Sequence, residues 1–190
     1  LVRFAYGVAS TVGLMMCHVF GVKDKRALPF AVDLGVAMQI SNIARDILED
    51  AQRDRVYIPA TLLHWPVSCK GLVRGDAAQR ASAYQGALQL LAIADEYYAS
   101  AAAGYGYLPV SVRQAIKVAA RLYQAIGEKV ARDESAYWQQ RTVVSAERKC
   151  LLIAQLFVQR LRDGSSTLLI GKIEHAEHLH QALDRQRFTA

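Results

Sequence analysis

The sequence predicts an all-α protein, and three observations support this prediction. Apolar residues recur at helical spacing through almost the whole chain, and no convincing alternating strand pattern is present. Gly21 and Gly104 follow the ends of two apolar segments, where helices commonly stop. The 190 residues are 53% apolar and 21% charged, a composition typical of a folded protein long enough for one domain with a sizeable core.

The first part of the chain contains two expected helices and a long loop. The first helix covers about Val2 to Phe20, and the second covers about Lys25 to Gln52. Residues 53–75 contain two prolines and two glycines. We therefore expect a loop there, with at most a short helical turn at residues 59–63.

Three more helices are expected further along the chain. The third begins at Asp76, which can cap it, and ends before Gly104. The fourth opens at Ser111, where Gln114 three residues on would complete a capping box. The fifth covers about residues 145–163, with an apolar stripe along one face.

The two ends of the chain differ from its middle. Residue 1 is a leucine already inside an expected helix, so we expect a domain over residues 1–165 that is incomplete at its N-terminus. Residues 166–190 are polar and without pattern, which indicates a loose tail. This segment has neither an apolar anchor nor a fourth ligand, so no metal site is expected from its three spaced histidines, His175, His178 and His180.

Charge and cysteine content exclude some classes of function. The formal net charge is +6, but Lys and Arg are spread without a basic block, so no nucleic-acid partner is expected. Three cysteines at unrelated spacings fit neither a disulfide framework nor a zinc motif, which indicates a reducing compartment. No signal peptide and no stretch of about 18 apolar residues is found, so we expect a cytoplasmic protein without a spanning segment.

One segment of the second expected helix contains the candidate residues for catalysis and ligand binding. Four polar side chains would point within roughly 40° of one direction on a helix: Gln39, Asn42, Asp46 and Asp50. The preceding stretch, residues 34–43, carries no charge and is typical of a buried helix. A buried helix that presents two carboxylates one turn apart usually faces a cavity.

Two like charges one turn apart repel each other, so a compensating group is expected. Mg²⁺ is a natural candidate, because it binds one or two carboxylates together with phosphate oxygens and water. Gln39 and Asn42 can add an oxygen ligand or donate to a diphosphate. The alternative is a solvated face on which the two aspartates pair with nearby arginines, namely Arg45, Arg53 and Arg55.

The sequence resembles the squalene/phytoene synthase family in several segments. Three of them agree in order and spacing: YGVASTVGLMM from Tyr6, LGVAMQISNIARDILED from Leu34, and RVYIP from Arg55. ARLYQAIGEKV from Ala120 and WQQR from Trp138 also match, so the resemblance covers most of residues 1–162. The sequence around the aspartates is most similar to that of bacterial phytoene synthases.

The resemblance implies an isoprenoid synthase (class I terpenoid synthase) helical bundle around an apolar cavity. Two aspartate-rich motifs face each other across its mouth. The first lies upstream of the matched region, and Asp46 and Asp50 fall on the second. Together with Asn42 they would hold Mg²⁺, with Mn²⁺ as the other possible ion.

The resemblance also implies roles for individual residues. The catalytic set would be Asp46, Asp50 and Tyr6, the last of which matches a tyrosine near the ionising centre. The positions that match substrate-binding residues are Gln39, Asn42, Arg45, Tyr123 and Arg141. The Met15, Met16 and Phe20 group is expected to be core.

The implied activity is that of a phytoene synthase in carotenoid biosynthesis. Two geranylgeranyl diphosphates would condense head to head through a cyclopropylcarbinyl diphosphate, releasing diphosphate without NADPH. One alternative is a squalene or dehydrosqualene synthase that uses farnesyl diphosphate, and another is a non-catalytic family member. Such apolar substrates imply peripheral contact with a membrane.

Overall fold

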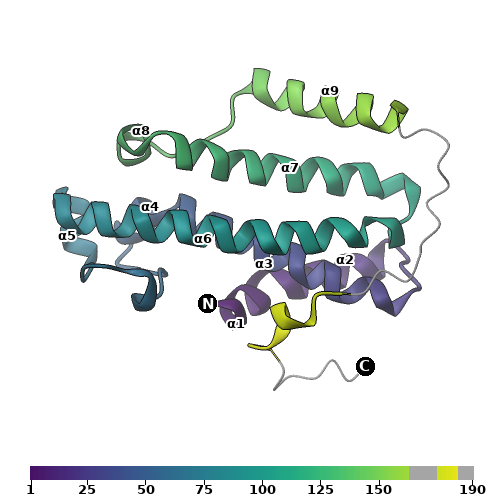
Figure 1. Ribbon diagram of the computed structural model, residues 1–190, viewed down its shortest axis with the longest axis horizontal. Coiled ribbons are helices and arrows are strands. Elements are labelled where there is room, and N and C mark those ends of the chain that lie inside the picture. Colours follow the sequence, from purple (N-terminus) through teal and green to yellow (C-terminus); the bar gives the residue numbers. More distant parts are fainter. Residues whose placement is uncertain (163–174, 184–190) are drawn as a thin grey trace.

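The computed structural model describes residues 1–162 and 175–183, and this part of the chain is helical without a strand (Figure 1). The longer helices are α2 (Thr11–Val19), α3 (Leu28–Arg45), α6 (Ala77–Ala103), α7 (Val110–Arg132) and α9 (Ala146–Arg162). The shorter ones are α1 (Val2–Ala5), α4 (Ile47–Ala51), α5 (Cys69–Arg74) and α8 (Glu134–Gln139). The all-α prediction is therefore confirmed over the described residues.

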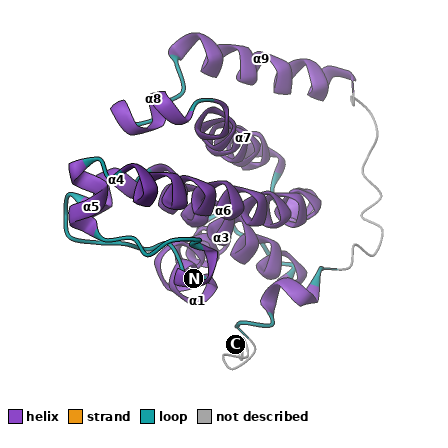
Figure 2. Ribbon diagram, turned by 60° about the vertical axis from the view of Figure 1, so that its left-hand side comes forward, coloured by secondary structure: helices purple, strands orange, loops and turns teal. Residues whose placement is uncertain are grey.

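The long helices are stacked in layers, as Figures 1 and 2 show from two directions. Helix α9 lies on the outside against α7, α6 follows, and α3 lies beyond α6 with α2. Helix α3 is central, because it packs most extensively on α6 and also contacts α2 and α7. A residue on α3 can therefore face several different elements.

The α3–α6 interface is close because α6 presents small residues to it. Ala83, Ala87 and Ala94 share one face of α6 with the larger Leu90, and each of the four is at most 1% exposed. Helix α3 places larger side chains such as Val36 in this core. Full burial of one such side chain contributes about 1.5–3 kcal/mol.

The crossing of the N-terminal helix over α3 is tighter still. A Cβ atom on Gly35 would lie only 2.5 Å from the Cα atom of Ser10, so only glycine fits on α3 here. Ser10 is fully buried, and its hydroxyl donates to the carbonyl oxygen of Val32 at 2.8 Å. The polar group in this crossing is thus satisfied.

Two of the expected helices contain interruptions. The expected helix over residues 25–52 ends at Arg45, because Asp46 adopts φ −101° and ψ 20°, and α4 continues after it. The first expected helix contains a π-helical turn over Tyr6–Ser10 between α1 and α2. Such a turn shifts the register of the side chains that follow it.

Local capping explains two helices that the sequence pattern did not predict. Helix α5 lies inside the expected loop, where the Ser68 hydroxyl accepts from the Gly71 amide at 3.1 Å and Gly75 ends the helix at φ +83°. Helix α8 begins after Asp133, whose carboxylate accepts from the Ala136 amide at 2.9 Å.

Capping also decides where two expected helices begin. The predicted cap at Asp76 is confirmed, since its carboxylate accepts from the Gln79 amide at 3.0 Å. The predicted capping box at Ser111 is wrong, because α7 begins at Val110 after Pro109 with no side-chain cap. Proline there supplies a preset φ at the helix start.

The expected loose tail does not hold for residues 175–183. This segment forms a short 3-10 turn, Glu177–His180, and Leu179 and Leu183 are buried in the main core. The apolar anchor that the sequence pattern did not reveal is therefore present. The rest of the expected tail lies outside the described residues.

Two stretches are long and apolar enough to cross a membrane, contrary to expectation. These are residues 2–19 and 25–45, and the criterion is length and composition alone. The second stretch is 61% buried inside the protein, as a core helix is, whereas the first is only 17% buried. The expected core group is accordingly exposed in part, with Met15 at 59%.

Candidate functional site

The polar stripe predicted on residues 39–50 survives the break at Asp46. The Asp46 amide still donates to the Asn42 carbonyl at 2.9 Å, and the Asp50 amide donates to the Asp46 carbonyl at 2.8 Å. The chain therefore keeps a helical path, and Asp50 follows Asp46 by one turn. All five expected polar residues of this stretch line one hollow of about 310 Å³: Gln39, Asn42, Arg45, Asp46 and Asp50.

Asp46 is paired with two arginines. Arg45 Nε donates to Asp46 Oδ1 at 2.7 Å, and Arg141 Nε donates to the same oxygen at 3.1 Å. Burial by itself raises the pKa of Asp46, but the hydrogen bonds from Arg45 and Arg141 outweigh it and lower the pKa below its usual value. Asp46 is therefore held as a carboxylate.

Asp50 is in the opposite electrostatic situation. Burial and the charge of Asp46 raise the pKa of Asp50, and the more distant charge of Arg53 only partly offsets them. Within residues 1–162 and 175–183, no cationic group lies within 4.0 Å of its carboxylate. The solvated-face alternative thus describes the Arg45–Asp46 pair but not Asp50.

Asn42 adds an acceptor without a donor. Its Oδ1 atom is buried and has no hydrogen-bond partner in the part of the chain that the structure describes, a situation that is costly unless a ligand relieves it. Oxygen atoms of Asn42, Asp46 and Asp50 are hard ligands of the kind that Mg²⁺ or Mn²⁺ prefers. The unpaired amide oxygen and the unpaired carboxylate of Asp50 therefore fit a divalent cation.

Arg141 is not among the residues that line the hollow, but it reaches Asp46 because α8 is anchored to the end of α3. The Tyr137 hydroxyl donates to the carbonyl oxygen of Ala44 at 2.7 Å, and burial raises its pKa so that it stays protonated. The Tyr137 and Trp138 rings meet edge to face at 4.8 Å, and Arg80 lies over the Trp138 ring at 5.1 Å. Sequence reasoning missed Tyr137, whose only signal was its place beside the matched WQQR segment.

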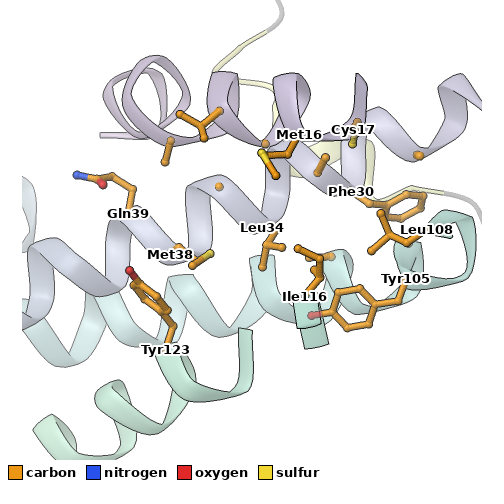
Figure 3. A pocket seen from close by; sticks show the side chains of 18 of the residues that line it. Met16, Cys17, Phe30, Leu34, Met38, Gln39, Tyr105, Leu108, Ile116 and Tyr123 are labelled. Carbon is orange, nitrogen blue, oxygen red and sulfur yellow. The ribbon is translucent and has the colours of Figure 1, made fainter. Parts of the chain in front are cut away.

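An apolar cavity of about 350 Å³ adjoins the polar hollow. Figure 3 shows Gln39 and Tyr123 toward one end of it and Phe30, Tyr105 and Leu108 toward the other. Val8, Gln39 and Asn42 line both spaces, so the cavity and the hollow lie side by side at these three residues. Apolar lining comes from four α-helices: Val12 and Met16 of α2, Leu34 and Met38 of α3, Ala101 of α6, and Ile116 of α7.

The remaining predicted residues fall in different places. Tyr123 lines the cavity beside Gln39, and its substrate-binding role stays a prediction. Tyr6 sits on the π-helical turn and packs against the core, but it is not among the residues that line either space. Its catalytic role stays a prediction. Sequence reasoning missed Phe4 and Tyr57, which stack at 5.1 Å and line the polar hollow.

The fold and the site together define a class of protein. A hollow whose oxygen atoms fit a divalent cation, beside an apolar cavity, suits a molecule with a metal-binding anionic head and an apolar tail. The family model for squalene/phytoene synthase matches residues 1–148. The chain belongs to this family.

Curated relatives are similar over most of the chain. A 15-cis-phytoene synthase of Enterobacter agglomerans is 42% identical over 154 residues, which are 80% of this chain and 51% of the relative. A 15-cis-phytoene synthase of Pantoea ananas is 39% identical, covering 84% of this chain and 53% of the relative. A phytoene synthase of Thermus thermophilus is 38% identical, with 83% and 54% covered. The chain thus spans about half the length of these relatives.

Proposed function

We propose that this protein acts as a phytoene synthase that joins two geranylgeranyl diphosphates head to head through a cyclopropylcarbinyl diphosphate. The observation that carries this proposal is that Gln39 and Asn42 line both the acidic hollow and the apolar cavity, so the two environments lie side by side. A prenyl diphosphate needs both environments at once. The names of the relatives support this choice of activity.

The hollow would hold the diphosphate through its own cations and amides. Arg45 and Arg141 are already oriented toward Asp46, and a diphosphate beside them would accept from the same guanidinium groups. Asn42, Asp46 and Asp50 would hold Mg²⁺, which supplies positive charge to the departing diphosphate when bound. No NADPH is required for this condensation.

The cavity would shield the allylic cation and position the two chains. Its walls are mostly apolar, so they exclude water that would otherwise quench the cation. Tyr123 stands between the polar end and the apolar wall, where its ring face can stabilise positive charge. Holding both alkenes in one cavity also supplies the orientation that the bond-forming step needs.

Farnesyl diphosphate remains the second candidate substrate, and it would give a squalene-type or dehydrosqualene-type product. We also propose a cytoplasmic enzyme that contacts a membrane peripherally, since substrate and product are strongly apolar. Exposed apolar side chains on α1 and α2, such as Phe4 and Val19, support such a contact or a covering partner segment.

The test is an assay of the complete gene product with Mg²⁺ and either farnesyl or geranylgeranyl diphosphate, without NADPH, followed by hydrocarbon analysis. A C40 product supports phytoene synthase, and a C30 product places the enzyme with the second candidate. Asp46→Ala should lower kcat by at least about a hundredfold. Glu49→Gln, a carboxylate change on the same helix outside the lining residues, is the matched control.

A further inference from the structure

The end of the apolar cavity opposite the metal motif contains an aromatic side chain, Phe30. Twelve residues of α3 separate Phe30 from Asn42, which corresponds to about 18 Å along the helix axis. This span is comparable to an extended C15 to C20 prenyl chain. A chain whose head lies at Asn42 would therefore bring its last isoprene unit toward Phe30.

The Phe30 ring is enclosed by its neighbours. It stacks on the Tyr107 ring at 5.9 Å, and the His175 ring meets it edge-on at 5.3 Å. A Cβ atom on Gly104 would collide with Phe30, so the backbone there also presses against it. Phe30 is only 4% exposed. The ring can move only if one of these neighbours moves.

His175 is held in turn by the buried carboxylate of Asp33. His175 Nε2 lies 2.8 Å from Asp33 Oδ2, and His180 Nε2 lies 2.7 Å from Oδ1. Ser100 Oγ donates to Oδ2 at 2.6 Å. A carboxylate only accepts, so each ring nitrogen here donates, and the distances are those of charge-assisted hydrogen bonds.

Further contacts attach residues 175–183 to the bundle. The Tyr97 hydroxyl donates to the Leu179 carbonyl at 2.8 Å, and Arg3 Nε donates to the Ala182 carbonyl at 2.8 Å. Leu183 is buried in the main core together with Leu179. The segment is therefore anchored on three helices, of which α3 also carries Phe30.

We propose that residues 175–183 form a clasp that fixes Phe30 as the floor of the prenyl cavity and so limits the prenyl chain length that the enzyme accepts. In this arrangement Phe30 is the specificity-determining residue, and His175 and Asp33 are positioning residues. The inference rests on the proposed function, because it concerns the chain of a prenyl diphosphate substrate.

The test compares two substrates in the complete gene product: the best one for the wild type and the prenyl diphosphate one isoprene unit longer. The ratio of kcat/KM, longer over best, does not depend on how much of a variant folds. Phe30→Ala should raise this ratio by about tenfold or more, because hydrophobic pockets discriminate on this scale. His175→Ala should raise it by about threefold, and the exposed His178→Ala is the matched control with no change.

An unchanged ratio in Phe30→Ala would contradict the assignment of Phe30 as the cavity floor. An unchanged ratio in His175→Ala alone would contradict the proposal that residues 175–183 fix Phe30 in place. If the wild type makes no product from any prenyl diphosphate, the proposed function fails. The same comparison is then made by calorimetry with non-hydrolysable thiodiphosphate analogues, whose Kd ratio still reports the floor.

Hydrogen exchange over residues 175–183 reports the clasp directly. Protection should fall in Asp33→Ala and persist in His178→Ala. If addition of EDTA lowers protection in the wild type, the hydrogen-bonded clasp is contradicted. A metal site at Asp33, His175 and His180 would then hold the segment.

Discussion

Two carboxylates near opposite ends of the cavity, that of Asp33 on α3 and that of Asp50 on α4, have opposite surroundings. Asp33 is fully buried, and three donors bond its two oxygens. Asp46 is partly exposed and is followed one turn later by Asp50, which has no cation within 4.0 Å among the described residues. Asn42 beside them has a buried oxygen that accepts no hydrogen bond from any described residue.

The difference separates a structural carboxylate from one that we propose to bind a ligand. A completely satisfied buried group stabilises the fold and has no capacity left for a ligand. Repelling carboxylates and an unpaired acceptor weaken the fold locally, and they are retained where a ligand relieves them. Hydrogen-bond satisfaction, more than residue type, therefore distinguishes the two ends.

The largest loss of stability is expected on substitution of Asp33, whose carboxylate accepts hydrogen bonds at both oxygens. Asp33→Ala removes three hydrogen bonds and leaves two imidazoles and the Ser100 hydroxyl without their acceptor, so it should destabilise the protein by about 3 kcal/mol. Urea denaturation of the complete gene product measures this change. A loss no larger than that of His178→Ala would contradict the assignment of Asp33 as a structural group.

A smaller loss of stability is expected at the helix crossing of Gly35 and Ser10. Gly35→Ala places a methyl group 2.5 Å from the Ser10 Cα atom, and the two helices must separate to admit it. We expect a destabilisation of about 2 kcal/mol in the same urea experiment. Gly7→Ala is the matched control, since nothing lies within 4 Å of a Cβ atom there; equal effects would show that the crossing is not tight.

The loop beyond the functional end stores a little backbone strain. Asp54 has φ +56°, a left-handed conformation that glycine adopts without steric cost. Asp54→Gly should therefore stabilise the protein by about 0.5 kcal/mol, a gain visible as a higher urea midpoint. A lower midpoint would mean that the Asp54 side chain contributes more than its backbone costs.

The smallest expected change in stability has the opposite sign to that of Asp33→Ala, because the substitution should stabilise the protein. Asp50→Asn removes a carboxylate that is partly solvent-screened and repelled by Asp46, so metal-free protein at pH 7 should gain about 0.3 kcal/mol. The folded pKa of Asp50 is raised, so the stability of the wild type falls as pH rises through the ordinary Asp range, near pH 4. The gain in stability should therefore vanish below that pH. The Asp50→Asn variant should also lack activity.

If Asp50→Asn is less stable than the wild type at pH 7 in EDTA, the Asp50 carboxylate is not unfavourable in the metal-free protein.

Much of the candidate site could be predicted from local spacing. The stripe from Gln39 to Asp50 follows from helical periodicity, and the hydrogen bonds through Asp46 keep it intact despite the break. The cap at Asp76 was predictable for the same reason, because donor and acceptor are three residues apart. The break at Asp46 and the helices α5 and α8 were not, because short helices depend on their surroundings.

The all-α class, the family and the acidic stripe follow from the amino-acid sequence alone, because they depend on residues close together along the chain. Which distant groups meet that helix depends on the tertiary structure. Arg141 reaches Asp46 across 95 positions, and His175 reaches Asp33 across 142. Such pairs are set by how whole helices pack, and packing depends on many weak contacts that no local pattern encodes.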